Sequence, residues 1–210
     1  MRQYAGEYIM KILGITGGVG AGKSTILDYI QKMYGARVIQ CDLVGHMVQE
    51  PGQSCYYRIV ETFGTGILNG DQTINRGKLS AAVFGDYAAL QKLNQIVHPA
   101  VKEYIVKEIE AEKKRGKVPF VVVEAALLLE DRYDLICDEI WYIYADEETR
   151  TERLMRTRGY SIEKARGIMA NQMKESGYRA RCSVVIDNSG TIVENTYEQI
   201  DKSLVERGFL

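Results

Sequence analysis

The chain has 210 residues, of which 46 % are hydrophobic and 26 % are charged, and its formal net charge is −1. This balance is typical of a globular protein that buries a core without disulfides or a structural metal, and it creates no global field that would attract nucleic acid or an anionic membrane. The longest apolar stretch, 118–129, is interrupted by Pro119 and Glu124 and is far shorter than the ~20 residues of a membrane helix. We therefore expect neither a nucleic-acid partner nor a membrane anchor.

Short apolar runs predict five β-strands. In chain order they cover 9–15, 37–39, 120–123, 139–144 and 184–186. Amphipathic patterns predict helices over 23–33, 147–172 and 192–205. Alternation of strands and helices is typical of a parallel sheet covered on both faces, so we expect a three-layer α/β fold with a five-stranded parallel sheet.

The region 43–115 interrupts this alternation with helical patterns. Leu93, Ile96 and Val97 have helical spacing, and His98-Pro99 is expected to open a new helix with proline in its first turn. The region is interpreted as a helical insertion into the α/β core.

The strongest motif follows the first predicted strand, where residues 17–24 match G-x-x-x-x-G-K-[ST]. Its glycines allow backbone N–H groups to surround a phosphate at the positive end of the next helix. Lys23 would reach the β- and γ-phosphates, and the Ser24 hydroxyl would bind Mg²⁺. The motif therefore predicts an ATP and Mg²⁺ site. The residues expected to bind the nucleotide are Gly18, Val19, Gly20, Ala21, Gly22, Lys23, Ser24 and Thr25.

GTPases, ATP-driven switches and small-molecule kinases share such a phosphate loop. The guanine-reading motif N-K-x-D does not occur in the sequence, and the chain is short for a motor or transporter ATPase. The main interpretation is a small-molecule kinase.

Asp42 stands at the end of the second predicted strand. Parallel strands end at the same crevice, so this carboxylate can orient an acceptor hydroxyl and accept its proton. The alternative is that Asp42 caps the helix that follows.

Arginines gather on one face of the predicted helix over 147–172, where Arg150, Arg153 and Arg156 are three residues apart. Guanidinium groups suit phosphate oxygens, so we expect this helix to form a lid. The alternative is a solvated face paired with neighbouring glutamates.

Several motifs together resemble the dephospho-CoA kinase family. The motifs lie at 15–25, 93–99, 127–130 and 185–190, and the resemblance covers nearly all of 10–205. It implies ATP-dependent phosphorylation of the ribose 3′-hydroxyl of dephospho-CoA, the last step of coenzyme A synthesis. It further implies that Asp42 is the catalytic base, that Lys23 and Arg153 act on phosphate, that His98 lies near the substrate and that Asn188 lies near the adenine.

The resemblance also implies a three-part molecule. The expected nucleotide-binding core comprises 10–42, 118–146 and 180–210, the acceptor-binding domain comprises 43–117 and the lid comprises 147–179. Residues 1–9 are interpreted as an N-terminal extension without the apolar segment of a secretory signal, and Met10 is an alternative start.

The four cysteines form no C-x-x-C pair, which favours reduced thiols and a cytoplasmic location. The protein is expected to be a monomer or a small homo-oligomer.

The sequence departs from the family pattern at four places: Gln40-Cys41, Glu124-Ala125-Ala126, Thr157 and Tyr178. Thr157 replaces the family's second lid arginine, and Tyr178 replaces a basic residue common after the lid. Two alternatives stay open: a kinase for another nucleotide or nucleoside, and a degenerate, non-catalytic protein that binds ATP or CoA.

Overall fold

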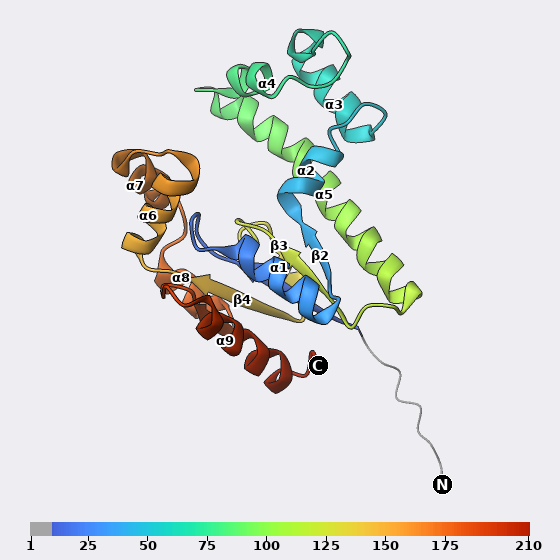
Figure 1. Ribbon diagram of the computed structural model, residues 1–210. Helices are drawn as coiled ribbons and strands as arrows, with labels where there is room; N and C mark the ends of the chain where they lie inside the picture. The colour runs from blue at the N-terminus through green and yellow to red at the C-terminus, as the bar shows by residue number, and fades with distance from the viewer. Residues whose placement is uncertain (1–9) are drawn as a thin grey trace. The chain divides into compact units, whose positions relative to one another are not determined.

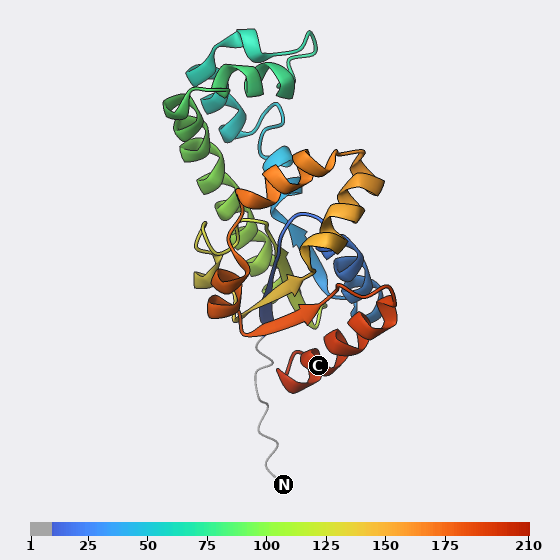
Figure 2. The same cartoon turned by 90° about the vertical axis from the view of Figure 1, so that its left-hand side faces the viewer.

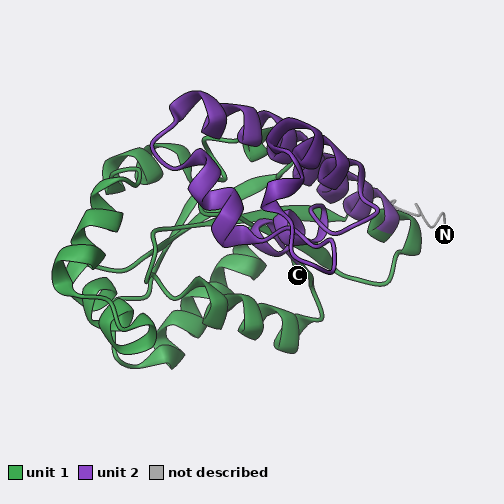
Figure 3. Ribbon diagram, turned by 90° about the horizontal axis from the view of Figure 1, so that it is seen from above, with its two compact units in different colours: residues 1–38, 112–210 green, residues 39–111 purple. Residues whose placement is uncertain are grey.

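The computed structural model describes residues 10–210, so the predicted extension over 1–9 lies outside the described residues. The chain divides into two compact units (Figure 3). Unit 1 comprises the residues up to 38 together with 112–210, and unit 2 comprises 39–111, where the sequence predicts an insertion over 43–117. The two units are described separately below.

Five strands form one sheet in the order β2-β3-β1-β4-β5. Their bounds are Lys11–Thr16 for β1, Arg37–Gln40 for β2, Phe120–Glu124 for β3, Glu139–Tyr144 for β4 and Val184–Asp187 for β5. In the central register, Ile15 of β1 pairs in parallel with Glu124 of β3 and with Trp141 of β4. The predicted five-stranded parallel sheet is confirmed.

One face of the sheet is covered by α1 (Lys23–Tyr34) and α9 (Val193–Glu206), which lie on the same side in Figure 2. The strands contribute apolar side chains at alternate positions, since successive residues of a strand point to opposite faces. Leu13 and Ile15 of β1 and Trp141 and Ile143 of β4 belong to this core, together with side chains of both helices.

The opposite face carries α8 (Glu175–Arg181). The buried Tyr178 ring stacks on Tyr142 of β4, with the ring centroids 4.5 Å apart and an interplanar angle of 9°. Helices thus cover both faces, as a three-layer fold requires.

The predicted helix over 147–172 is wrong as a single element. The structure has α6 (Glu147–Arg158) and α7 (Ile162–Ala170). Gly159 ends α6 in the left-handed conformation, with φ 63°, and the Ser161 side chain caps α7 by accepting a hydrogen bond from the Lys164 N–H. A left-handed glycine followed closely by a serine cap stops one helix and starts another.

Unit 2 is helical, and Figure 1 labels its helices. They are α2 (Cys41–Met47), α3 (Ser54–Phe63), α4 (Arg76–Val83) and α5 (Tyr87–Arg115), with a 3₁₀ turn η1 (Thr65–Ile67) between α3 and α4. A second 3₁₀ turn, η2 (Tyr133–Leu135), belongs to unit 1.

The prediction that a new helix opens at Pro99 is wrong, because α5 runs through Pro99 without a break. Ile96 lies before Pro99 and Val101 and Ile105 lie after it, and all three are buried. Burial of side chains on both sides of Pro99 outweighs the hydrogen bond that an internal proline removes.

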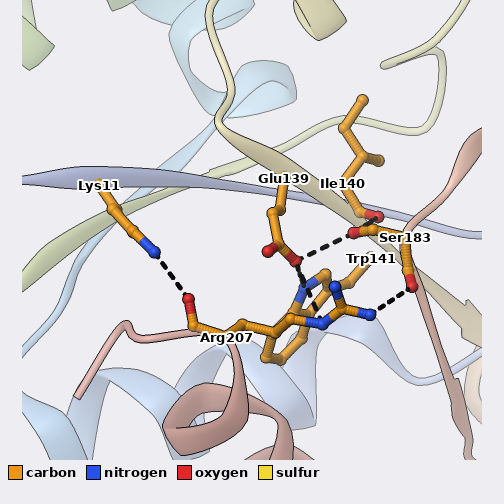
Figure 4. A network of polar contacts seen from close by, with 6 residues as sticks. All are labelled: Lys11, Glu139, Ile140, Trp141, Ser183 and Arg207. Atoms are coloured by element: carbon orange, nitrogen blue, oxygen red, sulfur yellow. Dashed lines mark hydrogen bonds and ion pairs between the residues drawn. The ribbon is translucent and has the colours of Figure 1, made fainter.

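A polar network fastens the end of the chain to the sheet at the edge where its strands begin (Figure 4). The Lys11 ammonium donates to the Arg207 carbonyl at 2.7 Å, and Arg207 donates to the Ser183 carbonyl at 3.1 Å. Glu139 accepts from the indole N–H of the buried Trp141 at 3.1 Å, so the indole is not left unsatisfied. The phosphate loop leaves the opposite edge of the sheet, where β1 ends.

Candidate functional site: a phosphate loop in contact with two arginines

The phosphate loop joins β1 to α1, as the sequence predicts. Gly22 occupies the N-cap of α1 with φ 87°, a left-handed conformation that favours glycine. A Cβ at Gly22 would collide with the amide nitrogen of Asn188, and a Cβ at Gly18 would collide with the Arg150 guanidinium. The position of Gly22 therefore favours a residue without a side chain, whereas a side chain at Gly18 would displace the Arg150 guanidinium from the loop. The N–H groups of this helix start are suited to an anion.

Lys23, at the start of α1, lies against the backbone of the loop. Its ammonium donates to the Gly17 carbonyl at 2.8 Å and lies 3.6 Å from a carboxylate oxygen of Glu124, whose side chain is 10 % exposed. Glu124 is the last residue of β3, next to the end of β1. An ammonium and a carboxylate therefore share the end of two neighbouring strands, with Ser24 and Thr25 exposed beside them.

The structure brings the predicted Arg153 and Asn188 to the loop. Arg153 donates to the Asn188 carbonyl at 2.9 Å and to the Ala21 carbonyl at 3.4 Å. The buried Asn188 side-chain amide also donates to the Ala21 carbonyl, at 2.7 Å. Burial, and then the neighbouring charge of Arg156, lowers the pKa of Arg153.

Arg150 and Gln172 form a second contact with the loop. Arg150 donates to the Val19 carbonyl at 2.9 Å and to the Gln172 amide oxygen at 2.8 Å. The same Gln172 oxygen accepts the Val19 N–H at 3.0 Å. Sequence reasoning missed Gln172, because no local pattern marks a contact between residues 153 positions apart.

Asp146 fixes the start of α6 beside the turn that follows β5. Its side chain caps α6 by accepting the Thr149 N–H at 2.7 Å, and its own N–H donates to the Ser189 hydroxyl at 3.0 Å. The hydrogen bond from the Thr149 N–H lowers the pKa of Asp146. This arrangement holds Arg150 and Arg153, which lie on the first turns of α6, over the loop.

A pocket of about 670 Å³ opens between α6 and this turn. Its lining combines polar and apolar side chains with the backbone of the turn: Thr149, Glu152, Arg153, Met155, Arg156, Ser189, Gly190 and Thr191. The volume falls in the range of small-molecule sites.

Asp42 and His98 belong to unit 2 and are placed only within it. Asp42 lies in the first turn of α2, whose N-cap is Gln40, so the alternative that Asp42 caps this helix is wrong. His98 lies in the middle of α5 with an exposed side chain.

Within residues 10–210, the structure has no cluster of three or more His, Cys, Asp or Glu side chains that could hold a metal ion by itself. The same residues include no helix with the length and apolar character needed to span a bilayer. No disulfide joins any of the four cysteines, all of which lie in this described part of the chain.

Comparison with known proteins identifies the family of this chain. The model of the dephospho-CoA kinase family matches residues 11–194. The chain belongs to the dephospho-CoA kinase family. A dephospho-CoA kinase of Shouchella clausii is 37 % identical over 194 residues, covering 92 % of this chain and 97 % of the relative.

Solved structures related to this dephospho-CoA kinase family member share its fold. The crystal structure of a Thermus thermophilus protein matches with a TM-score of 0.78 and 27 % identity, covering 94 % of this chain and 97 % of that one. Dephospho-CoA kinase from Campylobacter jejuni matches with a TM-score of 0.71 and 20 % identity, covering 96 % of this chain and 100 % of the other, which supports the fold.

Two departures from the family pattern have a structural role in this family member. Thr157 turns its hydroxyl onto its own helix and donates to the Arg153 carbonyl at 2.7 Å. Tyr178 is buried against Tyr142, and burial raises its pKa to about 12. Neither residue is hydrogen-bonded to the phosphate loop.

Proposed function

We propose that this protein transfers the γ-phosphoryl group of MgATP to the ribose 3′-hydroxyl of dephospho-CoA, the last step of coenzyme A synthesis. The observation that carries the proposal is a phosphate loop covered by Arg150 and Arg153 in a chain of the dephospho-CoA kinase family. Phosphoryl transfer needs little covalent chemistry from the protein, so positioning and charge neutralisation account for most of the catalysis.

The residues of the loop fit a nucleotide triphosphate with its metal. Backbone N–H groups and Lys23 suit the phosphates, and the Ser24 hydroxyl and the Glu124 carboxylate are the oxygen donors that Mg²⁺ prefers. Mg²⁺ usually binds through a few protein oxygens, phosphates and water, which agrees with the absence of a metal-binding cluster from residues 10–210. When bound, the ion would neutralise charge on the phosphates.

Arg153 is the proposed lid arginine of the reaction. Its guanidinium stays charged at neutral pH, and its contact with Ala21 supports a place at the developing charge of the transferred group. The pocket of about 670 Å³ beside Arg153 is the proposed adenine site, consistent with the expected role of the turn at Asn188. Closure of α6 and α7 would exclude water and suppress hydrolysis of ATP.

Asp42 is the proposed base, which accepts the proton of the acceptor hydroxyl. The proposal rests on its position two residues after β2, because ligands of open parallel sheets bind beyond the carboxyl ends of the strands. His98 is proposed to contact the acceptor, and the helices of 43–117 are proposed to form the acceptor-binding domain. A cytoplasmic location is also proposed, supported by four cysteines without a disulfide.

The test measures ADP formation from MgATP with and without dephospho-CoA, and the mass of the product. We expect acceptor-dependent turnover, and a loss of about 10²- to 10⁴-fold in Asp42→Asn, because general-base catalysis contributes that much. Asp28→Asn is the matched control, since Asp28 is an exposed carboxylate on α1. It should retain wild-type turnover.

Three outcomes would contradict the proposal in different ways. Turnover with another nucleotide or nucleoside, but not with dephospho-CoA, would favour a kinase for that acceptor. Tight binding of ATP or CoA without any turnover would favour a non-catalytic binding protein. Acceptor-dependent turnover that survives in Asp42→Asn would remove Asp42 from the role of base while leaving the reaction in place.

A further inference from the structure

Gln172 occupies a hydrogen-bond position in the phosphate loop. It lies just after α7, and its amide oxygen accepts two hydrogen bonds, from the Val19 N–H at 3.0 Å and from the Arg150 guanidinium at 2.8 Å. Arg150 also donates to the Val19 carbonyl at 2.9 Å. The backbone N–H and carbonyl of Val19 are therefore both hydrogen-bonded, the N–H to Gln172 and the carbonyl to Arg150.

The two donors that hold the Gln172 oxygen are of the kinds that hold a phosphate oxygen. Backbone N–H groups of the loop and guanidinium groups both bind phosphates, and their bonds strengthen when the acceptor is charged. The amide oxygen is the neutral acceptor in this position. The Val19 N–H carries a single hydrogen, so it cannot make a full bond to Gln172 and to a phosphate at the same time.

We propose that Gln172 is a positioning residue that substitutes for a phosphate oxygen between the Val19 N–H and Arg150, and that the phosphates of a bound nucleotide displace it. The inference rests on the proposed function only in that the loop binds a nucleoside triphosphate. Gln172 keeps Arg150 oriented over the loop. When the Gln172 side chain moves away, the Val19 N–H and the Arg150 guanidinium can both donate to phosphate. The cost of displacing it is included in the apparent affinity for the nucleotide.

Two substitutions with opposite expected effects test this competition. Gln172→Met keeps the length of the side chain but removes the acceptor, so MgATP should bind about 3- to 10-fold more tightly, the value of one net hydrogen bond. Gln172→Glu offers a charged acceptor to the same two donors, so MgATP should bind more weakly by at least the same factor. The measurement is calorimetric titration with MgATP and without any acceptor substrate.

The matched control is Asn171→Ala. The Asn171 side chain donates to the Gly167 carbonyl within its own helix, at 3.1 Å, and is exposed. This variant should leave the dissociation constant of MgATP unchanged. If Gln172→Met does not fold, Gln172→Asn carries the same expectation, because its side chain is one methylene too short to hold both donors.

A second measurement reads the hydrogen bond directly. In ¹⁵N-labelled protein without nucleotide, the Val19 amide proton should exchange faster and shift upfield in Gln172→Met than in the wild type. The Ala21 N–H, which donates to the Gly18 carbonyl at 3.2 Å, is an internal reference for the loop. An unchanged Val19 signal would overturn the proposal.

The binding data also separate this inference from the proposed reaction. If both Gln172 variants weaken MgATP binding, or neither changes it, Gln172 only supports the loop and the competition is refuted, while turnover with dephospho-CoA stands on its own. If the two variants shift the affinity in opposite directions but the wild type does not phosphorylate dephospho-CoA, the competition is supported and the acceptor is wrong.

Discussion

Replacement of Asn188 by alanine tests the contact that fastens the phosphate loop to the last strand. The side-chain amide donates to the Ala21 carbonyl at 2.7 Å, and its oxygen accepts the Thr196 hydroxyl at 3.0 Å. Asn188 and Thr196 are both buried, with 6 % and 2 % of their surfaces exposed. Asn188→Ala therefore removes two hydrogen bonds whose remaining partners have little access to water.

The magnitude follows from these two bonds. A hydrogen bond contributes a net ~1 kcal/mol, and a buried partner left unsatisfied costs about 1–3 kcal/mol. Each partner keeps one long hydrogen bond of 3.4 Å, the Ala21 carbonyl from Arg153 and the Thr196 hydroxyl to the Asp187 carbonyl, so neither is left fully unsatisfied. We expect Asn188→Ala to lower the free energy of unfolding by about 2–3 kcal/mol.

Urea denaturation followed by circular dichroism measures this loss, with Asn195→Ala as the control. Asn195 is exposed on α9, so its substitution should stay within about 0.5 kcal/mol of the wild type. Asn188→Asp should cost more than Asn188→Ala, because it places an oxygen against the Ala21 carbonyl where the amide donates. Wild-type stability in Asn188→Asp, or a loss below 0.5 kcal/mol (about the control's range) in Asn188→Ala, would refute the assigned hydrogen bonds.

Three further changes have expected outcomes in the same assay. Asp146→Ala should lower the free energy of unfolding by about 1 kcal/mol at neutral pH, because it removes the cap of α6. The folded state lowers the pKa of Asp146, so this stabilisation is present above the unfolded-state pKa of ~3.9. It disappears as the pH falls through the folded-state pKa. Gly22→Ala should lower the free energy of unfolding by about 2 kcal/mol, because it adds left-handed strain and a collision with a side chain. Gly35→Ala, at the other end of α1, has φ 66° and open space around it, so it should lower the free energy of unfolding by only about 1 kcal/mol. Pro99→Ala should raise the free energy of unfolding by about 1 kcal/mol or more, because it restores a donor inside α5.

Each of these predictions has a measurable outcome that would contradict it. If the destabilisation by Asp146→Ala persists unchanged at acid pH, the carboxylate is not the cap that the geometry indicates. Equal losses in Gly22→Ala and Gly35→Ala would show that the collision at the phosphate loop is relieved without cost. A lower stability in Pro99→Ala would mean that the proline ring itself contributes packing to α5.

The sheet and the phosphate loop were predictable because their signals are local. The run 120–123 is buried on both faces of a parallel sheet, so it appears in the sequence as an unbroken apolar segment. The loop needs glycines where its backbone has positive φ, as at Gly20 and Gly22, and this constraint appears as spacing in the sequence. No partner from elsewhere in the chain is needed to read either signal.

The two errors in the helices have different causes. The break between α6 and α7 could have been predicted from the sequence, because Gly159 followed by Ser161 is a helix stop and a helix start. The prediction missed it because the spacing of the arginines favoured one helix. At Pro99 the local rule favours a boundary, and only the burial of Ile96 before the proline and of Val101 after it shows that tertiary packing outweighs that rule. The sequence alone does not give the energy of that packing.

The contacts of the site join residues that lie too far apart in the sequence for any motif to predict them. Arg150 meets Val19 across 131 positions, and Gln172 meets it across 153. The arginine cluster was visible, but nothing in it distinguishes the two arginines that reach the loop from Arg156, which lines the neighbouring pocket. That distinction comes from the cap at Asp146, which sets the rotation and position of α6.

Three cations hold the backbone of the phosphate loop, and their arrangement explains why the substitution at Thr157 leaves these contacts in place. Lys23, Arg150 and Arg153 each donate to a carbonyl of the loop. Their acceptors are the alternate carbonyls of Gly17, Val19 and Ala21. Cations bound to these carbonyls are compatible with a phosphate-binding nest, in which loop N–H groups face an anion. In this structure the Val19 N–H donates to Gln172 and the Ala21 N–H donates to the Gly18 carbonyl. Residue 157 lies one turn beyond Arg153 on α6, and the Ala21 carbonyl that Arg153 contacts already has Asn188 as a second donor. The rate of phosphoryl transfer should therefore depend more on Arg150 and Arg153, which contact the loop, than on Thr157, whose hydroxyl donates to the Arg153 carbonyl.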